Sequence, residues 1–276
     1  MVTVVLALVA GCGKPAATTA TVTMGDMVLV PAGPFAMGNR NPLKPTLIER
    51  LKAFVQMKPQ PQVLDNDRNE VPVHTVSWYD CVKWCNARSE KEGLTPCYYE
   101  DKAKTGVYRE GRVDLDNDCV NWTTNGYRLP TEAEWEKAAR GGIAGRRFPW
   151  GNTISHSQAN YESDARFRYD KSMTRGYHPI TGSPPCTSPV GSFNPNGYGL
   201  YDMAGNVWEW TWDRYDCSYY SSSPGSDPRE PASGMSRVLR GGDWGDYAYN
   251  SRCAYRVSNF PDYGWGGGGF RCVRGL

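Results

Sequence analysis

The chain has 276 residues, and its 31 Lys and Arg nearly balance its 29 Asp and Glu, which leaves a formal net charge of +2. Nucleic-acid binding usually requires a basic surplus, so the composition argues against a nucleic-acid partner. The 30 Gly and 20 Pro predict a turn-rich fold but fall short of a disordered composition. Nine cysteines in one chain indicate an oxidising compartment.

The first segment, residues 1–12, is a short apolar run that ends in Val9-Ala10-Gly11-Cys12. Because a membrane span needs about 20 residues, the run predicts an export signal. Its last four residues resemble the bacterial lipobox, in which the cysteine becomes the lipidated N-terminus. Cys12 is therefore the predicted lipidation site, and the chain is expected in the bacterial cell envelope, outside the cytoplasm, with a lipid anchor in the membrane. The alternative is an ordinary signal peptide with an incidental cysteine.

Residues 13–25 are rich in Ala and Thr and predict a flexible tether, and residues 26–276 are interpreted as one domain. Short strands are expected at residues 28–31 and 35–38, on either side of a Pro-Ala-Gly-Pro turn. The apolar spacing between Thr46 and Met57 predicts a helix. Residues 58–73 are polar and proline-rich, and they predict a loop.

Two helices carry strong end signals. The first has Ser77 as N-cap, an acid three residues later at Asp80, and an expected end at Gly93. The second begins with a capping box at Thr131 and is expected to end at Gly141. No long amphipathic helix is expected after residue 142. Two helices followed by a long irregular, strand-containing remainder predict an α+β fold with much loop.

The cysteines other than Cys12 are even in number, which predicts up to four disulfides whose pairing the sequence leaves open. They are Cys81, Cys85, Cys97, Cys119, Cys186, Cys217, Cys253 and Cys272. The three histidines lie far apart in the sequence and form no metal-binding motif, which argues against a histidine-based metal centre.

The segment from Asp202 to Trp210 has the composition of a calcium-binding turn. Calcium prefers several hard oxygen ligands. Asp202 and Glu209 offer carboxylates, and the glycine-containing turn between them offers backbone carbonyls. On these residues alone, an ordinary capped turn is the alternative interpretation.

Several motifs together resemble the formylglycine-generating enzyme (sulfatase-modifying factor) superfamily, occur in its order and cover about residues 27–274. They are Met27-Val-Leu-Val-Pro-Ala-Gly33, Phe35-Ala-Met-Gly38, His74-Thr-Val-Ser-Trp-Tyr-Asp80, Gly126-Tyr-Arg-Leu-Pro-Thr-Glu-Ala-Glu-Trp-Glu136, Phe148-Pro-Trp-Gly-Asn152, Ala159-Asn-Tyr161, Pro189-Val-Gly-Ser-Phe193, Asn196-Gly-Tyr-Gly-Leu-Tyr-Asp-Met-Ala-Gly-Asn-Val-Trp-Glu-Trp210, Arg237-Val-Leu-Arg-Gly-Gly242 and Gly269-Phe-Arg271. The resemblance implies a C-type-lectin-like fold that is loop-rich, with two main helices, short antiparallel strands, structural calcium and a disulfide.

The resemblance also implies which residues bind calcium. At one site these are the side chains of Asp202 and Glu209 with the carbonyls of Gly205 and Val207. A second site would begin at Asn160 and Tyr161, although its later Asp has no match in this chain.

A disulfide between Cys85 and Cys272 is likewise implied by the resemblance. Cys97 with Cys119 is expected as a local bridge. Cys81 with Cys253 and Cys186 with Cys217 are then the remaining pairs.

The catalytic residues of the superfamily do not carry over. Its formylglycine-generating members bind copper through two cysteines after a Gly-Gly-Ser, because soft thiolates hold Cu(I). Here Asp243 replaces that Ser, Asp246 replaces the first cysteine, and no cysteine replaces the second. The lone Cys253 is expected to be structural, so copper is not expected. The matched positions Asp243, Asp246 and Trp208 mark where the catalytic site would lie, and no catalytic residue is assigned.

Residues 243–268 are dominated by Asp, Tyr, Asn, Ser and Gly, a composition typical of adaptable binding surfaces. The segment resembles the variable region of proteins diversified by retroelements, some of which are surface lipoproteins of this fold. The predicted ligand-binding residues are Trp244, Asp246, Tyr247, Tyr249, Asn250, Asn259, Tyr263 and Trp265. Their partner would be a protein, peptide or glycan. The alternative is a Gly-rich aromatic loop packed against the core.

Two hypotheses of function follow. The first is a non-catalytic, exported and calcium-stabilised binding module. The second is an enzyme of the superfamily that carries out metal- and oxygen-dependent oxidation, or sulfatase maturation, with altered site residues.

Overall fold

The computed structural model describes residues 71–181, 186–229, 231 and 233–275, together with the backbone of six strands before residue 56. Of these strands, β1 (Val4–Leu6) pairs antiparallel with β2 (Thr18–Ala20). Three residues of the expected tether are therefore in a strand. The predicted lipidation site Cys12 lies outside the described residues.

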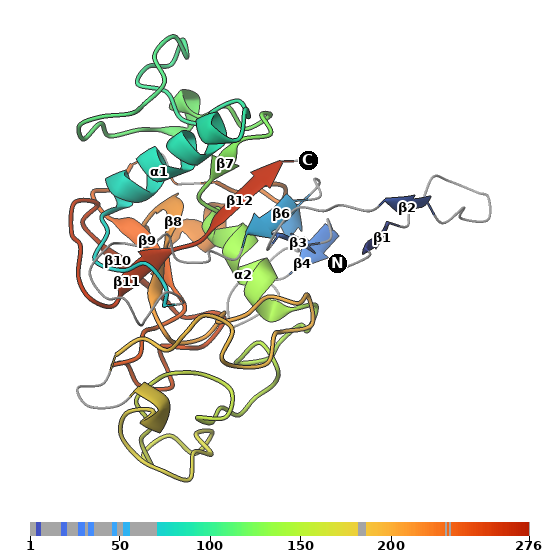
Figure 1. Ribbon diagram of the computed structural model, residues 1–276, viewed down its shortest axis with the longest axis vertical. Coiled ribbons are helices and arrows are strands. Elements are labelled where there is room, and N and C mark those ends of the chain that lie inside the picture. Colours follow the sequence, from blue (N-terminus) through green and yellow to red (C-terminus); the bar gives the residue numbers. More distant parts are fainter. Residues whose placement is uncertain are drawn as a thin grey trace.

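Two four-stranded sheets organise the chain (Figure 1). The central sheet has the order β10-β9-β8-β11, and the second sheet has the order β3-β6-β12-β7. Their strands are β3 (Met27–Val30), β6 (Lys52–Val55), β7 (Tyr127–Arg128), β8 (Trp208–Arg214), β9 (Arg237–Arg240), β10 (Arg256–Asn259), β11 (Gly268–Phe270) and β12 (Cys272–Gly275). The neighbours β8 and β11 run parallel, which corrects the expectation of antiparallel strands at this pair.

The helix predicted between Thr46 and Met57 is wrong. Strands β5 (Thr46–Ile48) and β6 occupy this stretch, and β6 pairs with β3 on one side and β12 on the other. Pairing with strands that are distant in sequence thus overrides an apolar spacing that suited a helix. The second predicted strand starts earlier than expected: β4 (Gly33–Phe35) pairs with β5.

Both capped helices are confirmed. Helix α1 (Trp78–Lys91) has Ser77 as N-cap in a capping box, and helix α2 (Glu132–Arg140) begins with a capping box at Thr131. Gly141 ends α2 in the left-handed conformation. Within the described residues after 142, the helices are the short η2 (Pro179–Thr181) and α3 (Tyr219–Ser222), as expected.

The main core lies between α1 and the central sheet and is rich in tryptophan. Trp78 from α1, Trp210 and Trp212 from β8 and Phe270 from β11 belong to one buried cluster. The Trp78 indole N–H donates to the Thr211 carbonyl at 2.9 Å, so helix and sheet are joined by a hydrogen bond as well as by packing. In Figure 1, α1 covers this sheet from above, whereas the segments after α2 form long loops below it.

The eight cysteines in the described residues are free thiols. Cys85 and Cys272 lie side by side, with a hydrogen bond between their side chains, and Cys81 is near both. Cys97 and Cys119 share the same core cluster, whereas Cys253 belongs to a different one, which separates it from Cys81. The structure places Cys85 beside Cys272 with both thiols free, and the disulfide that the resemblance implies stays a prediction.

Among the described residues, no helix combines the length and the apolar character that a membrane crossing demands.

Candidate functional site

Two polar turns meet at the start of β8. The first, residues 202–207, leads directly into the strand, and the second, residues 243–246, follows β9 through Gly241 and Gly242, both at positive φ. The Trp244 N–H donates to the Asn206 carbonyl, and the Gly205 N–H donates to the Gly241 carbonyl. The two segments in which the sequence predicts functional residues therefore share one end of the central sheet.

A close backbone approach requires glycine at position 205. Its φ is +74°, and a Cβ would lie 2.2 Å from the carbonyl oxygen of Asn160. The same carbonyl accepts the Asn206 N–H. Residues from both predicted calcium sites are thus in direct contact, although they are far apart in the sequence.

Glu209 is paired with a buried arginine. Its two carboxylate oxygens accept from Arg271 Nε and Nη2, each at 2.5 Å, and Oε2 also accepts from Trp135 Nε1 at 2.6 Å. This bidentate pair joins β8 to the residue between β11 and β12. A cation in the turn would have to share Glu209 with Arg271.

Asp202 lacks such a partner. Its Oδ2 accepts from the Gly191 N–H at 2.7 Å, whereas Oδ1 is buried and has no hydrogen-bond partner among the described residues. Burial raises the pKa of this carboxyl to about 6. A hard cation would satisfy the free oxygen, so Asp202 fits the calcium ligand that the sequence predicts.

The predicted second calcium site has fewer free donors. The Tyr161 carbonyl is 3.0 Å from His156 Nε2, and the Asn160 carbonyl already accepts from Asn206. The side-chain oxygen of Asn160, in contrast, is buried and has no hydrogen-bond partner among the described residues. Within the described part of the chain, no three His, Cys, Asp or Glu side chains converge on one point. A second calcium site at Asn160 and Tyr161 stays a prediction, with the Asn160 side-chain oxygen as its free donor.

Asp243 and Asp246 lie on one tight turn, which we call the acid pair. The Asp243 N–H donates to Asp246 Oδ2 at 3.3 Å, and the Gly245 N–H donates to Asp243 Oδ1 at 2.9 Å. Burial, reinforced by the neighbouring charge of Asp246, raises the pKa of Asp243 to about 7. No Lys or Arg of the described residues forms an ion pair with either carboxylate.

Two further side chains hold Asp246 in place. Trp208 Nε1 donates to its Oδ2 at 2.5 Å, and Asn250 Nδ2 donates to its Oδ1. The structure thus brings together the three positions that match the superfamily's catalytic region: Asp243, Asp246 and Trp208. Asn250, predicted as a ligand-binding residue, is only 6% exposed and lies behind Asp246.

Aromatic rings border the acid pair on one side. Trp244 packs against Tyr177 with ring centroids 5.9 Å apart, and Tyr249 packs against Phe167 and Tyr255 at 5.4 Å each. Tyr247 also contacts Phe167, at 6.0 Å, and lies under the Arg166 guanidinium. Sequence reasoning missed Phe167, Tyr177 and Tyr255, because no motif marks them and two of them come from a loop far upstream.

The remaining predicted ligand-binding residues lie further along the segment. Gly267 places Trp265 beside the acid pair, because a Cβ at this glycine would lie 1.8 Å from Asp243 Oδ2 and 3.0 Å from Trp265 Nε1. Tyr263 stacks on Trp265 with a centroid separation of 5.6 Å and is half exposed. Asn259 is in β10, and its Oδ1 accepts from the next N–H, that of Phe260.

Cys253 lies away from the acid pair. It is 1% exposed and packs with Trp135, Ala139 and Met203. Burial raises the pKa of its thiol to about 12, and a single thiol does not form the two-thiolate copper site of the superfamily.

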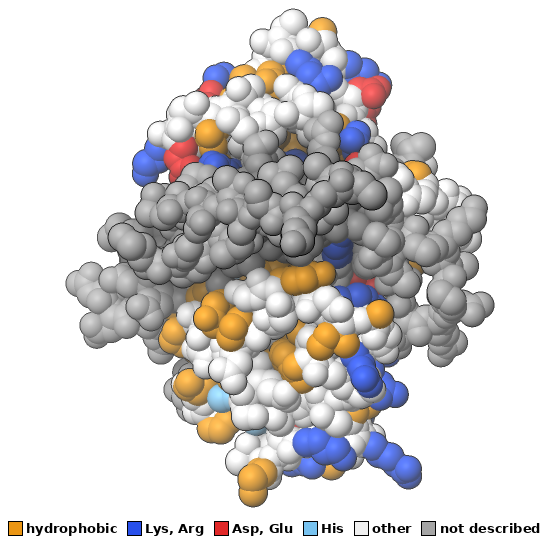
Figure 2. All heavy atoms as spheres, turned by 90° about the vertical axis from the view of Figure 1, so that its right-hand side faces the viewer, with side chains coloured by type: hydrophobic (Ala, Val, Ile, Leu, Met, Phe, Trp, Pro, Cys, Tyr) orange, Lys and Arg blue, Asp and Glu red, His pale blue; other side chains and the backbone are white. Residues whose placement is uncertain are grey.

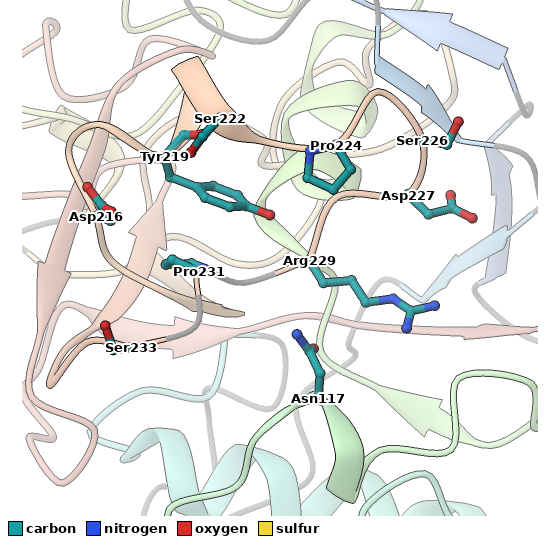
Figure 3. Close-up of a pocket in the computed structure, with 10 residues that line it drawn as sticks. All are labelled: Asn117, Asp216, Tyr219, Ser222, Pro224, Ser226, Asp227, Arg229, Pro231 and Ser233. Atoms are coloured by element: carbon teal, nitrogen blue, oxygen red, sulfur yellow. The ribbon is translucent and has the colours of Figure 1, made fainter.

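A separate open cavity of about 770 Å³ lies beyond the opposite end of β8 (Figure 3). Tyr219 and Arg229 point into it, and Asn117 closes it from the short helix η1 (Asn117–Cys119). None of the residues predicted from the sequence lines this cavity. The acid pair and this cavity are therefore different places on the molecule.

The loop that packs against Trp244 also exposes large apolar side chains. Met173, Tyr177 and Ile180 are 100%, 47% and 56% exposed. Figure 2 shows one face of the molecule, on which hydrophobic side chains gather in the lower half and Lys and Arg side chains lie along its lower right edge.

Comparison with known proteins identifies the domain. Residues 54–276 match the sulfatase-modifying factor enzyme 1-like domain. The formylglycine-generating enzyme of Streptomyces coelicolor is 46% identical over 153 residues, which are 54% of this chain and 46% of that protein. A mouse protein named inactive C-alpha-formylglycine-generating enzyme 2 is 40% identical over 189 residues, 64% of this chain and 54% of that protein. The chain spans about half the length of these relatives.

A longer match and a solved structure cover most of the chain. The chaperone protein LppX of Paenibacillus barcinonensis is 32% identical over 268 residues, 88% of this chain and 87% of that protein. Treponema denticola variable protein 1 has a similar structure, with a TM-score of 0.65, 27% identity and coverage of 91% of this chain and 95% of that one. The loop-rich α+β fold of C-type-lectin-like type is thereby confirmed. With its domain matched over residues 54–276, the chain belongs to the sulfatase-modifying factor family.

Proposed function

We propose that this chain is a non-catalytic member of its family and binds a protein, peptide or glycan through the surface around the acid pair. The observation that carries the proposal is the replacement of the first copper-binding cysteine by Asp246, together with the absence of the second cysteine. Asp246 is held by Trp208 and Asn250, and the nearby cysteine in the sequence, Cys253, is buried elsewhere with its thiol protonated. Thiolates hold Cu(I), whereas a carboxylate in their place is a hard donor.

The neighbouring side chains favour a binding role. Trp244, Tyr247 and Tyr249 are partly exposed, and each packs against a ring from the 154–181 segment or from the residues before β10. Rings held in this way give contact area at low entropic cost. The mouse relative that is named inactive agrees with a role other than catalysis.

We further propose that calcium stabilises the turn before β8. Asp202 would contribute its unpartnered Oδ1, Glu209 a carboxylate oxygen, and Gly205 and Val207 their carbonyls. The exported, lipid-anchored location stays a proposal as well, supported by the lipobox-like residues that end at Cys12.

The catalytic question is tested directly. The purified full chain, loaded with copper and supplied with oxygen and a cysteine-containing peptide, is expected to yield no formylglycine by mass spectrometry. Formylglycine in the product would overturn the proposal and favour the enzyme hypothesis.

The binding question needs a second assay. The full chain is applied to peptide and glycan arrays, next to Trp244→Ala, Tyr249→Ala and the control Met235→Ala, whose side chain is 82% exposed outside the proposed surface. The first two variants should lose most of the wild-type signal, and the control should keep it. Equal signals for all variants would place binding elsewhere.

A further inference from the structure

The two carboxyl groups of the acid pair form no ion pair with a Lys or Arg of the described residues. The titratable groups near Asp246 are Glu162 from the 154–181 segment and Tyr255 before β10. The Asp164–Arg166 ion pair lies next to Glu162, and Tyr249 and Arg252 lie next to Tyr255. Arg166 is engaged with Asp164, and Glu162 adds a further carboxylate near Asp246. Arg252 donates to the Tyr249 carbonyl. Among the described residues the acid pair thus has no Lys or Arg partner, and the donors to its oxygens are uncharged N–H groups.

A second observation points to a missing donor. Asn250 is directed at the acid pair, because its Nδ2 donates to Asp246 Oδ1. Its own Oδ1 is buried and has no hydrogen-bond partner among the described residues. A buried amide oxygen without a donor costs free energy, and a ligand that carries N–H or O–H groups would supply one.

The tryptophan side chains around the acid pair favour an organic cation over a metal ion. Trp208 donates to Asp246, Trp265 lies beside Asp243 across Gly267, and Trp244 comes from the same turn. The indole N–H groups of Trp208 and Trp265 at this site are donors only, so they give no ligand to a metal ion.

We infer that the acid pair is the receptor for a primary ammonium group, the side chain of a lysine on a protein or peptide partner. The ammonium would bind between the carboxylates of Asp243 and Asp246 and donate its third N–H towards Asn250 Oδ1. This inference rests on the proposed binding function and specifies its ligand chemistry.

The test uses two small probes that differ only in the charged group. Nα-acetyl-lysine methylamide is titrated into the full chain, and Nα-acetyl-norleucine methylamide is the uncharged control. The indole N–H signals of the tryptophans in NMR spectra report binding, since Trp208 Nε1 contacts Asp246. We expect the lysine probe to bind at least ~10-fold more tightly than the control. Equal binding of the two probes, or no binding of the lysine probe, overturns the inference.

Matched variants locate the site. Asp243→Asn and Asp246→Asn should each weaken lysine binding by roughly 10-fold or more. Asp262→Asn removes an acid of the same segment that is exposed and paired with Arg112, and it should change affinity less than about twofold. Asp243→Asn keeps an acceptor for Gly245, so it serves if Asp246→Asn fails to fold. Unchanged affinity in a folded Asp243→Asn chain overturns the inference.

The pH dependence is a further readout. The pKa of Asp243 lies near 7, and the ionised form binds the cation, so affinity for the lysine probe should rise between pH 6 and pH 8. A constant affinity over this range counts against the acid pair. If array ligands bind the wild type and Asp246→Asn equally well, the lysine assignment fails and the binding function stands. If no array ligand binds, the proposed function itself fails.

Discussion

Two groups of carboxylates near strand β9 differ in whether they are paired with arginine. On one side, Glu136 pairs with Arg240 at 2.6 Å and with Arg140 at 2.7 Å, and Glu132 pairs with Arg256 at 2.6 Å. On the other side, three residues after Arg240, the acid pair begins at Asp243 and has no arginine or lysine partner among the described residues. The carboxylates that contact Arg240 and Arg256 are therefore paired with arginines, whereas the carboxylates that begin three residues after Arg240 are not.

This difference separates the carboxylates that serve the fold from those that we propose to serve a ligand. Burying a charge costs several kcal/mol unless a partner compensates it, so uncompensated carboxylates reduce stability. Groups with strongly shifted pKa values cluster at functional sites. The arginine-paired glutamates join α2 to the central sheet, whereas the acid pair and Asp202 are the places where an added cation would restore the balance.

The largest expected effect comes from breaking the compensated group. Glu136→Gln leaves Arg240 and Arg140 without their shared carboxylate, and it should lower the free energy of unfolding by about 3–5 kcal/mol. Guanidinium denaturation measures this change. Glu90→Gln, which breaks the exposed pair with Arg109, is the matched control and should cost less than about 1 kcal/mol. A similar loss in both variants would contradict the comparison.

A smaller effect is expected at Asp202, where calcium would act as the partner. Calcium at about 100 times its dissociation constant should stabilise the wild type by roughly 2.7 kcal/mol, and Asp202→Asn should abolish this gain. Asparagine tolerates the positive φ of this position, +54°, and retains an acceptor for Gly191. Thermal melting with calcium and with EDTA gives the readout. Glu209→Ala is a poorer choice, because it leaves Arg271 buried and unpaired.

Identical calcium shifts in the wild type and in Asp202→Asn would refute the calcium assignment. Without calcium, the variant should be more stable than the wild type above pH 6, since burial raises the pKa of Asp202 to about 6 and its charge is then unfavourable.

The next effect concerns the acid pair itself. The folded pKa of Asp243, about 7, lies above the value of 3.8 expected without the fold, so the native state binds a proton between these pH values. The free energy of unfolding should therefore fall as pH rises from about 4 to 7. Asp243→Asn should remove this pH-dependent fall. At pH 8 it should raise the free energy of unfolding by on the order of 1 kcal/mol, a figure reduced because solvent screens the partly exposed Asp243. Urea denaturation at pH 5 and pH 8 provides the measurement, and parallel pH profiles would count against it.

The smallest effect is expected at the segment's exposed ion pair. Asp262 and Arg112 are 52% and 65% exposed, with their nearest charged atoms 3.4 Å apart. Asp262→Asn should change stability by less than about 0.5 kcal/mol at any pH, because solvent screens the pair. A loss of more than about 1 kcal/mol in urea denaturation would show that exposure is a poor guide to the role of these carboxylates.

Local signals predicted the parts of the fold that depend on neighbouring residues. Ser77 and Thr131 cap their helices as expected, since a cap hydrogen bond joins residues three positions apart. The stretch from Thr46 to Met57 was predicted wrongly as a helix, because the partners of β6 lie in β3 and β12. Its apolar spacing carries no information about those distant strands.

The candidate site was predicted in composition but not in arrangement. Asp243, Asp246 and Trp208 follow from the motifs, yet the sequence does not place Asn250 behind Asp246 or Phe167 and Tyr177 at the aromatic border. These contacts join a loop near residue 170 to one near residue 245, and their geometry depends on the intervening chain.

The sequence by itself determined the family, the ends of α1 and α2 and the loss of the thiol pair, because each of these is written in consecutive residues. The tertiary structure alone decided which carboxylates are compensated. Glu209 meets Arg271 from 62 positions away, and Glu136 meets Arg240 from 104 positions away, whereas Asp243 meets another carboxylate. The pKa of a carboxyl group depends on the charges and the water around it, and folding alone brings those surroundings together.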